Sequence, residues 1–506
     1  MKKIIGIDLG TTYSAIATLD DLGNPEIIPN PENNNKITRA AVYIGKDNAI
    51  VGDKALEASI TEPKKVAKKA KIKMADKVVF STKEGKWIEG SKGYTPSQVS
   101  SLVLSKLKDY TSGVKKVVIT VPARFGQASR TGTLDAAKLA GMEAELINEP
   151  TAAVLHYANL PGVKISGRVL VFDLGGGTFD ITIAKVKDKK VDVVTSRGDI
   201  HLGGEDFDDQ LIKIIDKKYK KAKGKGLDIN NSKLAQTAEK IKKILSSKEK
   251  VNEIIEGSKG PHKIEITREE FEESIDTYLE KIKMLMEEAL DDAKCQPSNI
   301  SQCLLVGGGT RMPIISKIIK KIMKKDPVKG VNVDEAVALG AAIYAGLQNK
   351  TDLNSAQKKA MSKVELQDVV SWNMGTTAVI QDPEKKNWVR INVTVIPRDT
   401  PKPCSETQDL SILADDQEII NCCVTQSDGE EKELDFVEII AEKKLKLGKG
   451  RKAGEPIKVT YSYDANQTMH CVFEDVSKKK KVELNLKPEG SKTIKELKEN
   501  LDFEIE

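Results

Sequence analysis

The chain has 506 residues, and 81 lysines and arginines stand against 75 aspartates and glutamates, which leaves a net charge of +6. A basic surplus this small argues against nucleic-acid binding, which needs a large and clustered one. No apolar run approaches the roughly 20 residues that cross a bilayer, so we expect no membrane partner. The six cysteines show neither zinc-ligand nor disulfide spacing, which favours a cytoplasmic location.

Residues 1–350 alternate two kinds of periodicity. Short runs rich in β-branched residues, such as KKIIGID and RVLVFDL, are typical of buried strands. Between such runs, apolar residues recur with helical spacing over residues 96–110, 128–140, 207–222, 234–246 and 268–293. Strands that alternate with helices predict an α/β domain over residues 1–350.

From about residue 370 the pattern changes. Seven short strand-like runs, from WVRINVTVIP to KVELNLK, are separated by Gly, Pro, Asp and Asn. This spacing favours an antiparallel sandwich, which we place at residues 370–490. The polar stretch 351–369 is predicted to be a linker, and residues 491–506 a short tail or helix.

Two segments of the chain match each other. Residues 4–20 and 169–186 each consist of an apolar strand that ends in Asp, a Gly/Thr turn and a second strand. Glycines let backbone N–H groups approach a phosphate, and the strand-end aspartates, Asp8 and Asp173, can hold Mg²⁺ through water. The repeat predicts a duplicated fold that grips one nucleotide. A third glycine turn, at 304–313, is either a nucleoside contact or an ordinary strand-to-helix turn.

The motifs IDLGTTYS, VITVPARF, INEPTAAVLHY, FDLGGGTFDI, HLGGEDFD and VGGGTRMP occur in the order and spacing of the 70-kDa heat-shock chaperones, the DnaK family. The sequence resembles that family over nearly its whole length. The resemblance implies an α/β actin-like two-lobed ATPase domain, a duplicated ribonuclease-H-like fold, followed by an all-β sandwich that binds peptides. It also implies ATP or ADP, Mg²⁺ and K⁺ as cofactors, and a role in protein folding and the stress response.

The resemblance assigns catalytic or metal-holding roles to Asp8, Glu149, Asp173 and Thr178. The aspartates would orient Mg²⁺ waters, the threonine would hold phosphate, and Glu149 would position the attacking water or, on the simpler interpretation, only start a helix. A catalytic lysine is expected in VAKKAKIKMADK, where Lys71 is the best match and Lys69 the rival. An ammonium there would stabilise charge that develops on the γ-phosphate.

The other nucleotide-binding residues that the resemblance implies come from six segments. Glu239, Lys243 and their neighbours repeat at helical spacing, so they share either the family's adenosine-binding face or an exposed polar face. The family stacks adenine between two arginines, whereas Lys243 and Arg311 stand here, which predicts weaker nucleotide binding. The full set is Gly10, Thr11, Thr12, Tyr13, Gly175, Gly176, Gly177, Gly203, Gly204, Glu205, Asp208, Glu239, Lys242, Lys243, Ser246, Gly307, Gly308, Gly309, Arg311 and Asp334.

Three departures from the family affect its allostery and partners. The linker VELQDV carries Glu365 and Gln367 where the family has a continuous aliphatic run. Glu145 reverses the charge of a residue that contacts J-domain co-chaperones, which puts that partner in doubt. The printed chain ends at Glu506, so we expect a short form that lacks the family's helical lid. The nucleotide exchange factor is left unidentified.

The resemblance also reaches the peptide domain. Pro122 and Arg130 match a relay from nucleotide to peptide. Trp388, Leu410, Leu413 and Ile420 align with the peptide pocket, although the aliphatic residues are equally well explained as strand core. The expected partner is an extended hydrophobic peptide of an unfolded protein. Two alternatives stay open: an ATP-switch clamp or scaffold for one dedicated partner, and an actin-fold small-molecule kinase.

Overall fold

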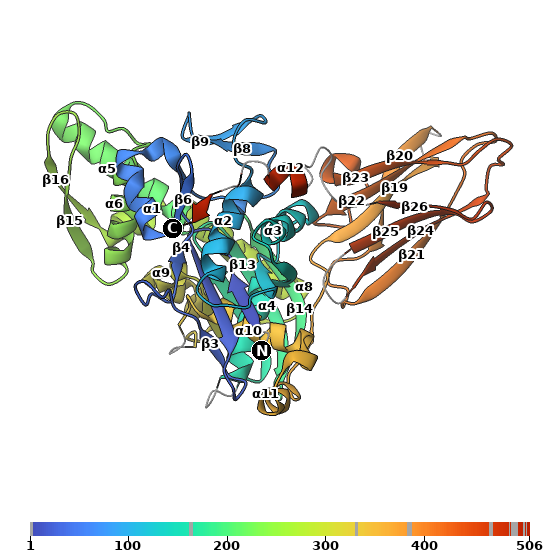
Figure 1. Ribbon diagram of the computed structural model, residues 1–506, viewed down its shortest axis with the longest axis horizontal. Coiled ribbons are helices and arrows are strands. Elements are labelled where there is room, and N and C mark those ends of the chain that lie inside the picture. The colour runs from blue at the N-terminus through green and yellow to red at the C-terminus, as the bar shows by residue number, and fades with distance from the viewer. Residues whose placement is uncertain are drawn as a thin grey trace. The chain divides into compact units, whose positions relative to one another are not determined.

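The computed structural model describes residues 4–160, 165–328, 332–381, 387–464, 469–484, 486, 494–498, 501 and 503–505. The chain divides into two compact units (Figure 1). Unit 1 comprises residues 1–123, 133–366 and 494–506, and unit 2 comprises residues 124–132 and 367–493. Among the residues in these described ranges, no helix has both the length and the apolar character to cross a membrane.

Two sheets of unit 1 repeat one strand pattern. In the order β11-β10-β1-β2-β3, strand β1 pairs parallel to β10 and antiparallel to β2. In the order β17-β12-β13-β14-β18, strand β12 likewise lies between parallel β17 and antiparallel β13. This repeat confirms the duplicated α/β fold. The bounds are β1 (Ile5–Asp8), β2 (Tyr13–Leu19), β3 (Pro25–Ile27), β10 (Lys116–Val121), β11 (Glu143–Asn148), β12 (Gly167–Leu174), β13 (Phe179–Lys187), β14 (Lys190–Asp199), β17 (Ile300–Val306) and β18 (Glu365–Gln367).

Helices cover these sheets and fill two apolar cores. The first core joins both sheets to α4 (Glu149–Asn159) and α10 (Ala336–Gln348). These two helices approach so closely that a Cβ atom on Gly340 would lie 1.8 Å from the carbonyl oxygen of Ala152, so only glycine fits there. The second core joins β12 and β13 to α5 (Gly204–Lys223), α6 (Ser232–Leu245), α8 (Asp276–Asp292) and α9 (Pro313–Met323).

Smaller elements surround this centre. They include a sheet of order β27-β6-β5-β7 and two hairpins, β8–β9 and β15–β16. The remaining bounds in unit 1 are β4 (Thr38–Arg39), β5 (Val42–Ile44), β6 (Asn48–Val51), β7 (Val66–Ala67), β8 (Val78–Ser81), β9 (Lys86–Glu89), β15 (Lys250–Ile255), β16 (His262–Thr267), β27 (Glu504–Ile505), α1 (Asp53–Thr61), α2 (Pro96–Lys108), α7 (Arg268–Ser274), α11 (Ser355–Met361) and α12 (Ile494–Lys498), with α3 (Gln127–Leu139) shared between the units.

The structure differs from the sequence prediction at one helical region, and it adds detail at the predicted linker. The single helix predicted over residues 268–293 is two helices, α7 and α8, because Ile275 leaves the helical conformation at φ −105° and ψ 8°. The stretch predicted as a linker, residues 351–369, carries α11 and β18. Val364 is buried in the first core, whereas Glu365 is exposed and forms an ion pair of 2.7 Å with Lys190.

Unit 2 contains the predicted sandwich. Its two four-stranded antiparallel sheets have the orders β20-β19-β22-β23 and β21-β24-β25-β26, and one apolar core fills the space between them. Strand β19 is absent from the sequence prediction, because Gly375 and its threonine neighbours interrupt the apolar alternation. The bounds are β19 (Asn373–Gln381), β20 (Trp388–Ile396), β21 (Cys404–Ser411), β22 (Ile419–Ser427), β23 (Glu438–Lys446), β24 (Pro456–Tyr463), β25 (Met469–Asp475) and β26 (Lys480–Leu484). Of the predicted tail at 491–506, residues 491–493, 499, 500, 502 and 506 lie outside the described residues.

Candidate nucleotide-binding site

A cavity of about 480 Å³ lies in unit 1, where the turns of the two matching segments meet. Gly10 and Thr12 line it from the turn after β1, and Gly175 and Gly176 line it from the turn after β12. A Cβ atom on Gly176 would lie 2.0 Å from Oγ1 of Thr12, so the turns can approach this closely only through glycine. The two segments that match in sequence therefore face one cavity.

Five ionisable or hydroxyl side chains line this cavity together: Lys71, Glu149, Asp173 and Thr178, which are buried, and Asp8, which is half-buried. The ammonium of Lys71 donates a hydrogen bond to Glu149, and both side chains are less than one-tenth exposed. Oγ1 of Thr120 donates a hydrogen bond of 3.0 Å to Asp8. Charged groups this deeply buried are costly unless they are paired, so the cluster is typical of a functional site.

The electrostatics of the cluster show an excess of negative charge. Burial, together with the nearby charge of Glu149, raises the pKa of Asp8 to about 7. The same two causes raise the pKa of Asp173. Burial opposes the charge of Lys71, but the carboxylates of Glu149 and Asp8 prevail and raise its pKa. Three carboxylates thus surround one buried ammonium, an arrangement that a bound divalent cation would stabilise.

The structure separates the two candidate lysines. Lys71 is almost fully buried among the carboxylates, whereas 43% of the Lys69 side chain is exposed. Nζ of Lys69 forms an ion pair of 2.9 Å with Glu205, whose other oxygen accepts a hydrogen bond of 2.8 Å from Thr12. Both lysines line the cavity, but Lys71 is the one that pairs with the buried carboxylate of Glu149.

Helix α6 contributes a polar face to another wall of the cavity. Glu239, Lys242, Lys243 and Ser246 all line the cavity, as their helical spacing predicts. Nζ of Lys242 lies 2.8 Å from the carboxylate of Asp208, and Lys243 lies 2.7 Å from Glu239. This face is therefore part of the cavity wall, although 57% of the Lys243 side chain is exposed.

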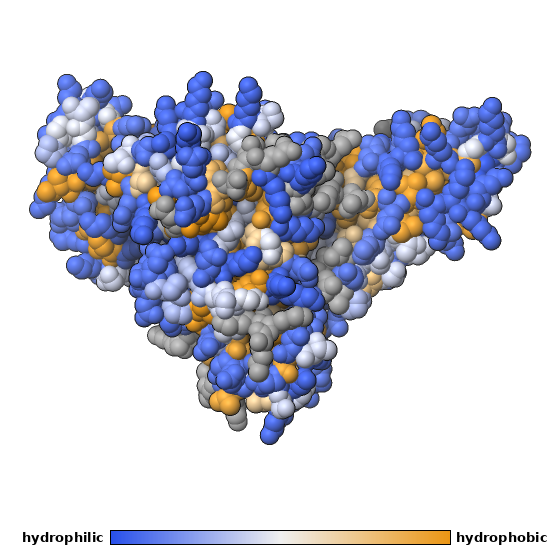
Figure 2. Space-filling model, in the orientation of Figure 1, coloured by the Kyte–Doolittle hydropathy of each residue, from blue (hydrophilic) through white to orange (hydrophobic). Residues whose placement is uncertain are grey.

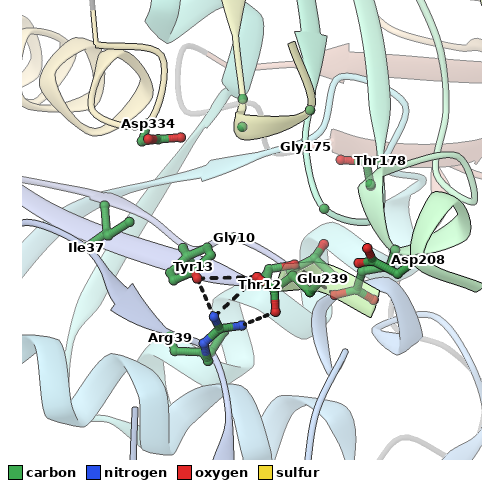
Figure 3. Close-up of a pocket in the computed structure, with 18 of the residues that line it drawn as sticks. Gly10, Thr12, Tyr13, Ile37, Arg39, Gly175, Thr178, Asp208, Glu239 and Asp334 are labelled. Atoms are coloured by element: carbon green, nitrogen blue, oxygen red, sulfur yellow. Dashed lines mark hydrogen bonds and ion pairs between the residues drawn. The ribbon is translucent and has the colours of Figure 1, made fainter. Parts of the chain in front are cut away.

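Arg39, on the short strand β4, was not predicted from the sequence. Its guanidinium donates a hydrogen bond of 3.1 Å to Glu239 and lies over the ring of Tyr13, 4.5 Å from its centroid (Figure 3). Burial disfavours ionised Glu239, but hydrogen bonds and charges from Lys243 and Arg39 lower its pKa to about 2. Arg39 thus supplies a planar cation close to Lys243, since both side chains contact Glu239 and lie over the ring of Tyr13.

The third glycine turn also reaches the cavity. Gly307, Gly308 and Gly309 line it directly after β17. Arg311 follows them and forms an ion pair of 2.6 Å with Asp334, with 56% of the Arg311 side chain exposed. This turn is therefore part of the same cavity as the first two.

Most of the predicted nucleotide-binding residues line the cavity, but Gly177 and Gly203 do not. The N–H of Gly203 donates to Asp206 at the start of α5, and a Cβ atom on Gly177 would lie 2.9 Å from Cγ2 of Thr11. Both glycines therefore contact the segments that form the cavity wall without lining the cavity themselves. The lining residues that the sequence did not indicate are Ile37, Arg39, Ala40, Ala41, Leu56, Lys68, Asp209, Ile212, Ala235, Gln236, Val306, Met312, Val333 and Val337.

The predicted relay and peptide residues lie elsewhere in the fold. Pro122 is buried directly after β10 in unit 1. In unit 2, Nε of Arg130 donates a hydrogen bond of 3.0 Å to the carbonyl oxygen of Phe125.

The four predicted peptide residues divide into two pairs. Leu410 and Ile420 are half-buried and pack against the sandwich core, as the strand-core alternative requires. Trp388 and Leu413 are exposed by 60% and 42%. Figure 2 shows further apolar surface over the sandwich strands, where Val379, Ile419 and Ile439 are also exposed.

Comparison with protein families identifies the group to which these features belong. A family model described as Hsp70 protein matches residues 4–502, a range that takes in both units and all three glycine turns. Members of this family are ATP-dependent chaperones: they bind ATP or ADP with Mg²⁺, hydrolyse ATP, and bind unfolded peptides and co-chaperones. The match covers nearly the whole chain, and the protein therefore belongs to the Hsp70 family.

Proposed function

We propose that this protein hydrolyses ATP with Mg²⁺ in the cavity of unit 1 and binds extended apolar peptide on the sandwich of unit 2. The observation that carries the first half is the meeting of two Gly/Thr turns beside the buried Lys71–Glu149 pair. Phosphoryl transfer to water requires cradled phosphates, a positioned nucleophile and stabilised charge, and little covalent chemistry from the protein. The residues of this cavity can supply each of these.

The roles follow from charge and hydrogen-bonding chemistry. Bound Mg²⁺ would neutralise phosphate charge, and Asp8 and Asp173 are the acceptors that fit its coordinated waters. Thr178 and the N–H groups of the glycine turns would donate to the phosphates. Lys71 would stabilise charge on the transferred group, while Glu149 would orient the attacking water. Asp8 and Asp173 suit this role because burial and the charge of Glu149 raise the pKa of each carboxyl group. A nearby cation would offset this crowding of negative charge.

The test is ATP turnover in purified protein with and without Mg²⁺. Asp8→Asn and Thr178→Ala should each lower turnover at least tenfold, which corresponds to about 1.4 kcal/mol of barrier. Asp21→Asn is the matched control, because Asp21 is an exposed aspartate of the same unit. Equal turnover in all four proteins would contradict the site assignment.

The second half of the proposal rests on the exposed apolar side chains of unit 2. Trp388 and Leu413 are large, apolar and accessible, so each could bury its side chain against an apolar peptide. A fluorescently labelled library of short apolar peptides, titrated by anisotropy in ADP and in ATP, tests binding and its dependence on nucleotide. Failure of every peptide to bind in both nucleotides would contradict this half alone.

Glu145 supports a second candidate, a nucleotide-switched clamp for one dedicated partner. It lies half-buried on β11, and it reverses the charge expected for general use of J-domain co-chaperones. Refolding of a denatured enzyme with a J-domain protein and an exchange factor distinguishes the two, because a dedicated clamp should give no refolding. The small-molecule kinase is disfavoured, because the family match includes a sandwich that a kinase does not need.

A further inference from the structure

The outer strand of one small sheet in unit 1 comes from the far end of the sequence. In the sheet of order β27-β6-β5-β7, strand β27 pairs parallel to β6, with Glu504 opposite Asn48 and Ile505 opposite Ala49. The N–H of Glu504 donates a hydrogen bond of 3.3 Å to the carbonyl oxygen of Asp47. Figure 1 shows this red strand beside β6, although more than 400 residues separate the two in the sequence.

Side chains anchor the segment 503–505 as well as its backbone. The ring of Phe503 contacts the ring of Tyr94, with centroids 5.7 Å apart. Tyr94 is itself held in place, because it exchanges two backbone hydrogen bonds with Phe80. Ile505 is half-buried, and Glu504 between the two apolar residues is exposed. This alternation is the pattern of an extended peptide that adds a strand to a sheet edge.

Strand β6 would otherwise be an edge of its sheet. Among the described residues, β27 is the strand that pairs with β6 on the side opposite β5. An uncovered edge presents free N–H and C=O groups, which are a template for another extended segment. The edge of β6 therefore offers backbone hydrogen-bonding groups, and Tyr94 offers an aromatic contact nearby. Together they fit a strand in which apolar and acidic residues alternate.

A short path leads from β6 to the nucleotide cavity. The chain passes from β6 through Gly52 into α1. Leu56 of α1 lines the cavity, and its carbonyl oxygen accepts a hydrogen bond of 3.3 Å from Nε2 of Gln236 on α6. The same amide donates to Oγ of Ser59 at 3.2 Å. Holding β6 in place thus also holds the helix that forms one wall of the cavity.

We propose that the outer edge of β6 is a strand-docking site, that residues 503–505 occupy it within the same chain, and that this docking slows nucleotide dissociation. The docking part depends only on the contacts of β27. The kinetic part rests on the proposed nucleotide site, through α1 and α6. The partner that fits this surface is an extended segment with apolar residues on either side of an acidic one.

The first test is hydrogen exchange on the full-length chain. Glu504→Pro removes the N–H that donates to Asp47, whereas Glu504→Ala removes the same carboxylate and keeps that N–H. We expect at least tenfold faster exchange of the amides of Asn48–Val51 in Glu504→Pro, no change in Glu504→Ala, and no change in the hairpin β15–β16 in either protein. Unchanged exchange at β6 in Glu504→Pro would overturn the docking site.

Two further measurements complete the experiment. A synthetic peptide of residues 498–506, added to Glu504→Pro, should restore protection of β6, and the same peptide with Phe503→Ser should not. Dissociation of fluorescent ADP should be at least threefold faster in Glu504→Pro than in Glu504→Ala. Equal dissociation rates with altered exchange would overturn the kinetic part alone. If no ADP binds, the proposed nucleotide site fails while hydrogen exchange still decides the docking.

Discussion

The ammonium of Lys71 and the carboxylate of Glu149 form a buried pair, although 78 residues separate them in the sequence. Lys71 follows the small sheet that contains β6, and Glu149 begins α4, at the end of β11. The two side chains meet only through the tertiary fold. Their pairing distinguishes Lys71 from its rival Lys69 in the lysine-rich stretch VAKKAKIKMADK. The groups proposed to position the nucleophile and to stabilise charge are thus in direct contact.

Lys71→Ala should abolish most ATP hydrolysis while ATP still binds. The reason is that Lys71 pairs with the buried carboxylate of Glu149, whereas Lys69 pairs with Glu205 and is partly exposed. We expect at least a tenfold loss of turnover, about 1.4 kcal/mol, for Lys71→Ala and less than threefold for Lys69→Ala. Single-turnover hydrolysis and ATP titration measure the two effects separately. The reverse order would move the catalytic role to Lys69.

Arg39→Ala should make nucleotide dissociate faster. Arg39 pairs with Glu239 and covers Tyr13 on the cavity wall, so its loss would remove one contact from each of these two cavity residues. Stopped-flow release of fluorescent ADP should accelerate about tenfold, equivalent to ~1.4 kcal/mol. Arg39→Lys keeps the charge but not the planar group, and we expect an intermediate rate. A rate equal to wild type in Arg39→Ala would remove Arg39 from the binding site.

Stability should fall as the pH is lowered from about 6.5 to about 4. Burial of His156 in α4 lowers its pKa to about 4, so the unfolded chain takes up a proton at this side chain before the folded chain does. Unfolding then becomes easier with falling pH, by at most roughly 3 kcal/mol for this group. His156→Asn should flatten the pH dependence of urea unfolding across this window. An unchanged slope in His156→Asn would contradict the prediction.

Trp388→Ala should weaken apolar peptide binding about tenfold without loss of stability. Trp388 is 60% exposed, so its removal leaves no cavity in the core. Phe436→Ala is the matched control, because Phe436 is an equally exposed aromatic residue of unit 2 that was not predicted to bind peptide. Anisotropy titration and thermal unfolding of the three proteins are the measurements. Equal losses of affinity in both variants would indicate a non-specific apolar surface.

The glycine turns, like the polar face of α6, are a part of the candidate site that could be predicted from the sequence. Their requirement for close backbone approach is local, and the structure brings the turns containing Gly10, Gly175 and Gly307 to one cavity. Arg39 could not be found in this way. It lies on the two-residue strand β4, which has no periodicity, and its partner Glu239 is 200 residues away.

The fold was predictable where elements are long and carry a clear period. Helices α2, α3, α5 and α6 lie within a few residues of their predicted ranges. The break at Ile275 was missed because apolar spacing continues across it from α7 to α8. Strands β5–β9 and β27 have two to four residues each, too few for alternation to show, and only their pairing partners define them.

The assignment of residues 494–506 to unit 1 gives that unit a piece from the far end of the chain. Unit 2, apart from residues 124–132, is in this sense an insertion between two pieces of unit 1. A recombinant fragment that stops at Leu366 would therefore lack β27 and leave the edge of β6 open to a neighbouring molecule. Such a fragment should self-associate at high concentration, whereas one that joins residues 1–366 to residues 494–506 through a flexible linker should stay monomeric in sedimentation.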